Sequence, residues 1–425
     1  MHRFTTPPVD ELISAHRGCS RRDFLSKGLA GLGMSAALPA LLQNTSFAMV
    51  AEALQSDAEQ HPNRILVVVE LTGGNDGLNT IVPYGHDEYY RARPTLGIRK
   101  SQVLKVNDEF GLDPQLLGLH RLFMDGKIAT IHGCGYENST QSHFKSMEFW
   151  HTGRPWAREF YGWAGRTADA MQSEPVDSII VNLGTSQSLA VKSRIHAPIV
   201  FQDPKRFTRN GLNRSEKELV DTMNEAENSA NSALAFLRRA SKAATASSAR
   251  IKRACQEYQT TMNYGGGNLS SDLRNIAALI AGGFQTKIYY ANLGGWDTHS
   301  DQNAGRNNPV QNLDDSLSGF LEDLKRMGRA DDVAIMVFSE FGRRVQENAS
   351  GGTDHGTAGP MFIMGEKVKG GFYGEHPSLT DLDNGNLKVT TDFRRVYATM
   401  IKEWLGFDDT ETILNGDYET FKAFA

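Results

Sequence analysis

The sequence has few cysteines, no membrane-length apolar run after its first fifty residues, and no excess of basic residues. Its three cysteines, Cys19, Cys134 and Cys255, are too few for a disulfide framework or a thiolate metal cage. Because no apolar run after residue 48 approaches the ~20 residues of a transmembrane helix, we expect no integral membrane protein. The formal net charge of −5 lacks the basic field of a nucleic-acid-binding protein, and we expect no nucleic acid as a partner.

The composition is otherwise that of a globular protein with a sizeable core. Of 425 residues, 40% are hydrophobic and 22% are charged, which is ordinary for a folded domain. The 41 glycines favour many tight loops over a helical bundle. The length permits one large α/β domain with insertions, or two to three average domains.

Residues 1–48 have the pattern of an export signal. Ser20–Leu25 reads SRRDFL, a weakly apolar stretch follows over Gly28–Leu42, and small residues end the segment at Ser46–Ala48. This order is typical of a signal peptide, and the adjacent arginines resemble the bacterial twin-arginine signal. A cytosolic N-terminal helix is the alternative. We expect export of the folded chain by the twin-arginine translocation machinery to the periplasm or cell exterior, a route that suits proteins loaded with a metal beforehand.

Residues 49–425 predict an α/β domain in which buried strands alternate with helices. A helical insertion is expected at 205–268, within which 214–262 is predicted to be a solvated helical hairpin. Outside the insertion, the basic stretch 83–101 is predicted to be a solvated loop or helix. The expected strands are Arg64–Leu71, Lys127–His132, Val176–Gly184, His196–Phe201, Lys287–Leu293, Val333–Phe338, 361–365 and 370–374. The expected helices include Leu116–Met124, Leu273–Ala281, Val310–Met327 and Phe393–Leu405.

Two early strands run into glycines followed by polar residues. Asp76 follows the first strand in TGGNDGLNT, and Ser142-His143 follow the second. Asp76 is either a metal ligand or a turn residue bonded to its own backbone. Ser142 is either a reactive serine at the start of a helix or merely the cap of that helix.

Two later strands end in the same way. Asp297 and His299 stand one residue apart after a Gly-Gly turn, so in extended backbone their side chains would point in the same direction. Glu340 follows the strand at Val333–Phe338, and a glycine-rich loop then brings Asp354 and His355. Taken singly, Glu340 also suits a helix N-terminus, and Asp354-His355 suits a polar loop.

Together these strand ends predict a metal centre, because ligands in open α/β sheets gather at the carboxyl ends of the strands. Asp76, Asp297, His299, Glu340, Asp354 and His355 are the candidate ligands of one or two divalent ions, with zinc, magnesium, calcium and manganese not distinguished. Ser142 is the candidate nucleophile, His143 a second catalytic candidate, and Arg343 (or Arg154) the cation for a small anionic ester substrate.

The motifs LTGGNDGLNTIVPY, GGWDTH, VFSEFGR and GTDHG resemble the family catalogued as domain of unknown function 1501. That family resembles the alkaline phosphatase and sulfatase superfamily. The resemblance implies a doubly wound, mostly parallel central sheet with helices on both faces and metals at the strand ends. It matches Asp76 to a metal aspartate, Asp297, His299 and His355 to the ligands of one metal, and Ser142 to the nucleophile. The superfamily carries Asp-His where this chain has Glu340-Phe341, and SHF at 142–144 lacks the sulfatase Cys-x-Pro-x-Arg pattern.

Two functions follow from this reading. The first is an exported metal-dependent hydrolase of the phosphate or sulfate ester class with a serine nucleophile. The alternative is a non-catalytic periplasmic or surface binding protein on the same scaffold that keeps a single structural metal, and the Glu340-Phe341 departure favours it.

Overall fold

The computed structural model describes residues 63–176, 178–205 and 248–425. The predicted signal peptide, residues 1–48, and most of the predicted insertion at 205–268 lie outside the described residues; within the insertion, residues 248–257 are helical. No helix in the described part of the chain combines the length and apolarity of a membrane span.

A nine-stranded sheet forms the centre of the fold, in the order β11-β5-β10-β9-β1-β8-β6-β7, with β14 beside β5. Its strands are β1 (Ile65–Leu71), β5 (Ile128–Gly135), β6 (Ile180–Leu183), β7 (Ile199–Phe201), β8 (Ile288–Leu293), β9 (Val333–Ser339), β10 (Gly359–Met364), β11 (Gly371–Tyr373) and β14 (Thr391–Asp392). Among them β10 alone runs against its neighbours, β5 and β9. The predicted mostly parallel sheet is therefore confirmed.

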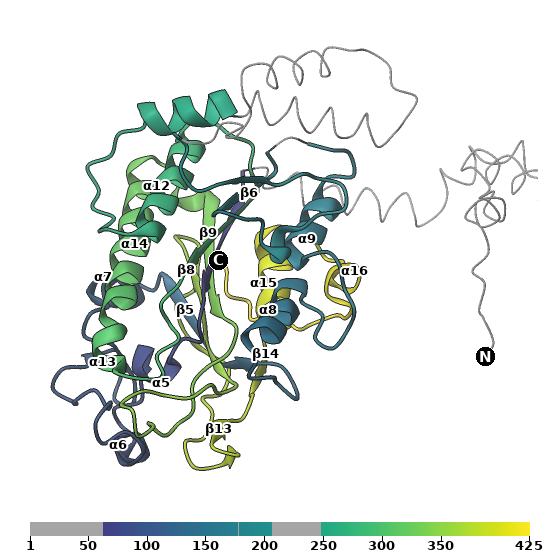
Figure 1. Cartoon of the computed structure of the whole chain (residues 1–425). Helices are drawn as coiled ribbons and strands as arrows, with labels where there is room; N and C mark the ends of the chain where they lie inside the picture. The colour runs from purple at the N-terminus through teal and green to yellow at the C-terminus, as the bar shows by residue number, and fades with distance from the viewer. Residues whose placement is uncertain (1–62, 177, 206–247) are drawn as a thin grey trace, which may run out of the picture. The chain divides into compact units, whose positions relative to one another are not determined.

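Helices cover both faces of this sheet (Figure 1), which confirms the doubly wound arrangement. Helices α7 (Leu117–Met124), α12 (Asn268–Ala281) and α14 (Asn307–Arg326) pack on one face. Helices α8 (His143–Thr152), α9 (Trp163–Met171), α15 (Phe393–Thr399) and α16 (Thr410–Leu414) pack on the other, with a π-helical turn, Met400–Trp404, after α15. Short helices α5 (Gly77–Thr80), α6 (Asp87–Ala92) and α13 (Gln302–Gly305) lie in the connections.

Strand β1 shows why these residues build a sheet buried on both sides. Ile65, Val67, Val69 and Leu71 face the core under α12 and α14, whereas Leu66 and Val68 face the core under α8 and α15. Side chains alternate between the faces of a strand, so a continuous apolar run supplies both cores at once.

Two small sheets complete the described structure. The first joins β2 (Ile81–Val82), β3 (Leu104–Lys105) and β4 (Gly111–Leu112), and the second pairs β12 (Leu382–Asp383) with β13 (Asn386–Leu387). The first sheet flanks stretch 83–101, where the prediction of a solvated segment is wrong for Arg93, whose side chain is buried. Its guanidinium is held by the Asp76 carboxylate and by backbone carbonyls.

Candidate metal centre

The carboxyl ends of β1, β5, β8 and β9 deliver their loops to one edge of the sheet. Because these strands run in the same direction, their following residues meet there. The loop after β1 turns at Gly73 and Gly74, with φ of 125° and 85°. A side chain at Gly73 would strike the Asp297 backbone nitrogen, and one at Gly74 would strike the Phe341 ring. Both glycines are therefore required by the close approach of these loops.

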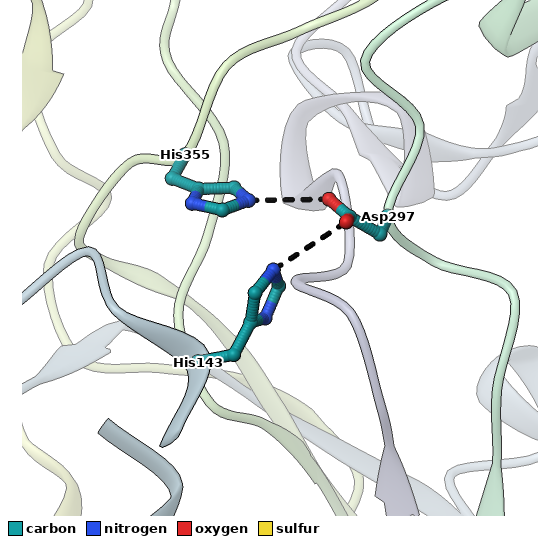
Figure 2. A group of neighbouring side chains, drawn as sticks. All are labelled: His143, Asp297 and His355. Carbon is teal, nitrogen blue, oxygen red and sulfur yellow. Dashed lines mark hydrogen bonds and ion pairs between the residues drawn. The ribbon is translucent and has the colours of Figure 1, made fainter. Parts of the chain in front are cut away.

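Asp297 is the centre of the cluster. Its carboxylate Oδ1 lies 3.1 Å from His355 Nε2 and 3.1 Å from His299 Nε2, and its Oδ2 lies 3.5 Å from His143 Nε2. Figure 2 shows His143, the first residue of α8, and His355, on the loop after β9, pointing toward this carboxylate. His143, Asp297 and His355 form a group whose ligand atoms all lie within 4.8 Å of one another, so it could hold a metal ion.

His299 joins this group by its own distances. Its Nε2 lies 2.9 Å from His355 Nε2, in addition to its approach to Asp297. Three imidazoles and one carboxylate thus converge. We name His143, Asp297, His299 and His355 the His₃Asp cluster.

Each imidazole of the cluster is held from behind through its Nδ1 atom. His143 Nδ1 lies 2.8 Å from Glu340 Oε1, and His355 Nδ1 lies 2.9 Å from the Gln141 carbonyl. His299 Nδ1 lies 3.3 Å from Asp354 Oδ1. Since a neutral imidazole donates through one nitrogen and accepts through the other, these contacts favour lone pairs on the Nε2 atoms. Those lone pairs face Asp297.

Electrostatics keep the cluster ready for a cation. Partial burial works against ionisation of Asp297, but the hydrogen bond and the charge of Arg343 outweigh it, and the pKa of Asp297 is lowered to about 2. Burial together with the nearby charge of Arg343 lowers the pKa of His355. The pKa of Asp354 is also lowered, and the main cause is the hydrogen bond that it accepts from Asn348. At neutral pH the carboxylates are charged and His355 is neutral, as metal ligands must be.

Glu340 stands beside the cluster and reaches it through His143. It is completely buried, and its Oε1 accepts from the Gly73 N–H and contacts His143, while its Oε2 accepts from the Gly74 N–H and the Ser339 hydroxyl. Both oxygens are therefore occupied by the protein. A carboxylate in this place orients the imidazole and raises its basicity.

Phe341, the residue after Glu340, packs against two imidazoles of the cluster. Its ring centroid lies 4.9 Å from that of His143 and 4.7 Å from that of His355. The side chain is buried. It therefore forms an apolar wall that restricts both imidazole rings. The sequence predicted only that Phe341 could not be a ligand, not this packing role.

Arg343 is fully occupied inside the protein. Its guanidinium donates to the carbonyls of Gly73, Gly74, Trp296 and Thr353 and to Asp297 Oδ1, at 2.7 Å for the last. Its side chain has no exposed surface. The structure thus gives Arg343 the position of a buried cross-link between three loops, with no surface exposed to a substrate anion.

Asp76 lies in a separate buried network. Its Oδ2 accepts from Arg93 at 2.6 Å and from Gln302 at 2.5 Å. Burial alone would raise the pKa of Asp76, but the Arg93 ion pair outweighs it and the pKa is lowered. The positive charge beside this carboxylate is an arginine, so Asp76 is not brought into the His₃Asp cluster.

Ser142 occupies the N-cap position of α8, one residue before His143, and is exposed. Its hydroxyl makes no capping hydrogen bond. The structure therefore does not give the Ser142 side chain the role of a helix cap. Arg154, the other cation considered, pairs with Glu159 at 2.6 Å and also donates to a backbone carbonyl.

Comparisons with known proteins gave a family match and distant structural similarities. No curated protein matches this chain. Three of the similar solved structures are a protein in the alkaline phosphatase superfamily from Vibrio parahaemolyticus, the lipoteichoic acid synthase LtaP from Listeria monocytogenes, and a phosphonate monoester hydrolase from Silicibacter pomeroyi. Their identities are 11%, 10% and 9%, and their TM-scores are 0.38, 0.37 and 0.36. The matches cover 88%, 84% and 84% of this chain and 78%, 74% and 76% of theirs.

Likenesses of this strength say nothing about activity. A family model, in contrast, matches residues 129–417, which is more than half of the chain and includes every member of the His₃Asp cluster. The chain therefore belongs to the family described as "Protein of unknown function (DUF1501)".

Proposed function

We propose that this chain is an exported metal-dependent hydrolase of phosphate or sulfate esters that holds one divalent ion in the His₃Asp cluster. The observation that carries the proposal is the convergence of three imidazole Nε2 atoms on the Asp297 carboxylate, while a separate acceptor holds each Nδ1. Outer hydrogen bonds of this kind fix the orientation of metal-binding histidines.

The distances within the cluster fit a small ion. Ligands in tetrahedral coordination at zinc bond lengths lie about 3.3 Å apart. Four contacts between ligand atoms of the cluster range from 2.9 Å to 3.5 Å, and the ligand atoms of His143 and His355 lie within 4.8 Å of each other. Imidazole suits zinc and its transition-metal neighbours, whereas magnesium and calcium prefer oxygen ligands. A zinc-type ion is therefore the better fit.

A single ion is favoured over two. Both oxygens of Glu340 accept from backbone N–H groups, and Asp76 Oδ2 accepts from Arg93 and Gln302. Asp76 Oδ1 has no hydrogen-bond partner among the described residues, but it is buried next to the Arg93 guanidinium, whose charge disfavours a second cation there.

The residues at the cluster suit attack on an anionic ester. A bound divalent ion supplies polarisation of the ester and lowers the pKa of a nearby hydroxyl. Ser142 is the nucleophile: its Oγ bonds to phosphorus or sulfur while the bond to the ester oxygen breaks, and the serine proton leaves on that oxygen as part of the alcohol. Water then hydrolyses the serine ester, which returns a proton to Oγ and releases phosphate or sulfate. The first-turn N–H groups of the ten-residue helix α8 have no intrahelical partner and stabilise the anion.

The test is metal content and turnover of the mature chain. Wild type should bind close to one equivalent of zinc and hydrolyse members of a phosphate- and sulfate-ester panel. Ser142→Ala should keep the zinc and lose turnover. Turnover that survives in Ser142→Ala would exclude the serine mechanism, and wild type without metal or turnover would remove the proposal.

The second candidate is a binding protein with a structural ion. It is supported by Arg343, whose side chain is buried and bonded to three loops of the protein. It is supported also by the Ser142 hydroxyl, for which the described residues provide no base in hydrogen-bond contact. Zinc binding that stabilises the fold, with no turnover across the panel, would favour this candidate.

A further inference from the structure

A polar pocket adjoins the His₃Asp cluster. Its volume is about 490 Å³, within the range of small-molecule sites. It lies between the segment that leads into α8 and the segment that contains β13 and β14. We name it the 136–392 pocket, after the first and last residues that line it.

The pocket shares its wall with the metal centre through Gln141. The carbonyl of Gln141 contacts His355 Nδ1, and its side-chain amide donates to Asn386 Oδ1 at 3.0 Å. Thr357, two residues after His355, also lines the pocket, and its hydroxyl donates to the Leu387 carbonyl. Two of the loops that carry cluster histidines therefore also form this pocket.

The lining indicates which chemical group belongs there. Half of the lining residues carry an amide or an aliphatic hydroxyl, among them Asn138, Ser139, Gln141, Thr357, Asn386 and Thr390. These groups both donate and accept hydrogen bonds, as the hydroxyls of a sugar do. Ser139 and Thr390 already donate their hydroxyl hydrogens to the Tyr136 and Glu375 carbonyls, so their oxygens remain as acceptors for the O–H groups of a sugar.

The charges of the pocket argue against a second anion. Its acidic residues are Glu137, Asp383 and Asp392, against the single basic residue Lys388. Lys388 pairs with Asp381, and Asp392 pairs with Arg394 at 2.5 Å. A group with its own negative charge would meet net repulsion, whereas a neutral polyhydroxylated group would not.

We propose that the 136–392 pocket is a subsite for a neutral sugar, so that the ester substrate carries its anionic group at the His₃Asp cluster and a neutral sugar in this pocket. The inference rests on the proposed function for the ester, while sugar binding itself does not require turnover. Trp156 is not among the lining residues of the pocket but is bonded to one of them, Glu137. Its indole N–H donates to the Glu137 carbonyl, and its ring, 58% exposed, packs on Phe149 at 4.8 Å. It offers a fixed apolar face beside the polar wall, such as the C–H face of a sugar covers.

The first test measures binding alone. Zinc-loaded mature protein is titrated with glucose, glucosamine and glucuronate by saturation-transfer NMR. Wild type should bind glucose saturably and glucuronate less well. Ser139→Tyr, which fills the pocket, should abolish glucose binding. Asn386→Ala should weaken it about three- to tenfold, the loss of one hydrogen bond. Asn308→Ala, an exposed asparagine of α14, is the matched control and should bind as wild type does.

The second test measures turnover. The ratio of kcat/KM for a hexose phosphate to that for methyl phosphate should fall at least about tenfold in Ser139→Tyr, because only the hexose occupies the pocket. No glucose binding, or binding that both pocket variants retain, would overturn the subsite. Glucosamine binding far tighter than glucose would also overturn it in favour of a cationic group. If no ester is turned over, the proposed function fails while the binding test still decides the subsite.

Discussion

The Nε2 atoms of His299 and His355 lie 2.9 Å apart, and both are 3.1 Å from Asp297 Oδ1. The other nitrogen of each ring is held by an acceptor, Asp354 or the Gln141 carbonyl. Two lone pairs and a carboxylate oxygen therefore face one another, an arrangement that a cation relieves. This contact is the geometric reason for counting His299 as a fourth ligand.

Replacing His299 should weaken metal binding. In His299→Ala the cluster keeps His143, Asp297 and His355 but loses one nitrogen donor. We expect the zinc affinity, measured by competition with a chelator, to fall by at least about tenfold. His120→Ala, on α7, serves as the control and should bind zinc normally. Unchanged affinity in His299→Ala would reduce the site to three protein ligands.

Replacing Glu340 by glutamine should weaken the metal without removing a ligand. The amide lacks the negative charge that orients His143, so zinc affinity should fall about 10- to 100-fold. Glu148→Gln, on the same helix as His143 and paired only with Lys145 in the described residues, is the matched control. A Glu340→Gln protein that folds, by circular dichroism, and binds zinc as tightly as wild type would show that Glu340 does not act on the site.

Arg343→Lys should destabilise the fold. Lysine keeps the charge but cannot supply the five donor contacts that join the loops at Gly73, Trp296 and Thr353. We expect the free energy of unfolding to fall by about 3 kcal/mol, from the penalty for buried groups left unpaired. Urea unfolding in chelator separates this loss from metal binding. Full stability combined with weaker phosphate binding would instead return Arg343 to the anion-holding role.

Stability should decrease in mild acid because of two histidines, His132 and His376, whose rings pack against Phe110. Burial, and next the neighbouring His376, lowers the pKa of His132 to about 3. Burial, and next His86, lowers the pKa of His376 to about 4. In the unfolded chain both histidines titrate near 6.5. Below that pH the unfolded state binds more protons than the folded state, so protonation stabilises the unfolded state. The stability is complete above about pH 6.5 and is lost as the pH falls toward 4.

His132→Phe tests this assignment. The new ring keeps the contacts with Phe110 and Phe372, whose centroids lie 5.3 Å and 4.9 Å from that of His132. The drop in unfolding free energy between pH 7.5 and 5 should shrink by about 2 kcal/mol, the contribution of one such histidine. Urea unfolding at both pH values in chelator measures it. An unchanged drop would place the acid sensitivity elsewhere.

Much of the fold was predictable because its strands are buried on both faces. Ile65–Leu71, Ile288–Leu293 and Val333–Ser339 are nearly continuous apolar runs, and they are the central strands. Parallel strands bring their ends together, so the sequence also indicated which loops meet. The direction of β10 was not predictable, because a short apolar run is the same in either direction.

The roles within the site were harder to predict, because they depend on partners far away in the sequence. Glu340 reads as a ligand until the Gly73 N–H, 267 residues away, occupies it. Arg93 reads as a solvated residue until Asp76 and two carbonyls enclose it. For His143, the third imidazole of the cluster, the sequence signal was its position directly after Ser142 at the start of a predicted helix.

The reversal of β10 has a consequence for how the site varies. Because β10 runs against β9, the loop 340–358 leaves and re-enters the sheet at the same edge, and it needs no crossover to the other edge. It carries both Glu340 and His355 between two paired strands. Loop-closure entropy rises only slowly with length, so an insertion at its tip, Ala349–Gly351, costs little through closure as long as the Ser350 and Gly351 carbonyls keep their bonds from the Asp301 and Gln302 N–H groups. A change of length there alters the surroundings of His355 while β9 and β10 keep their register.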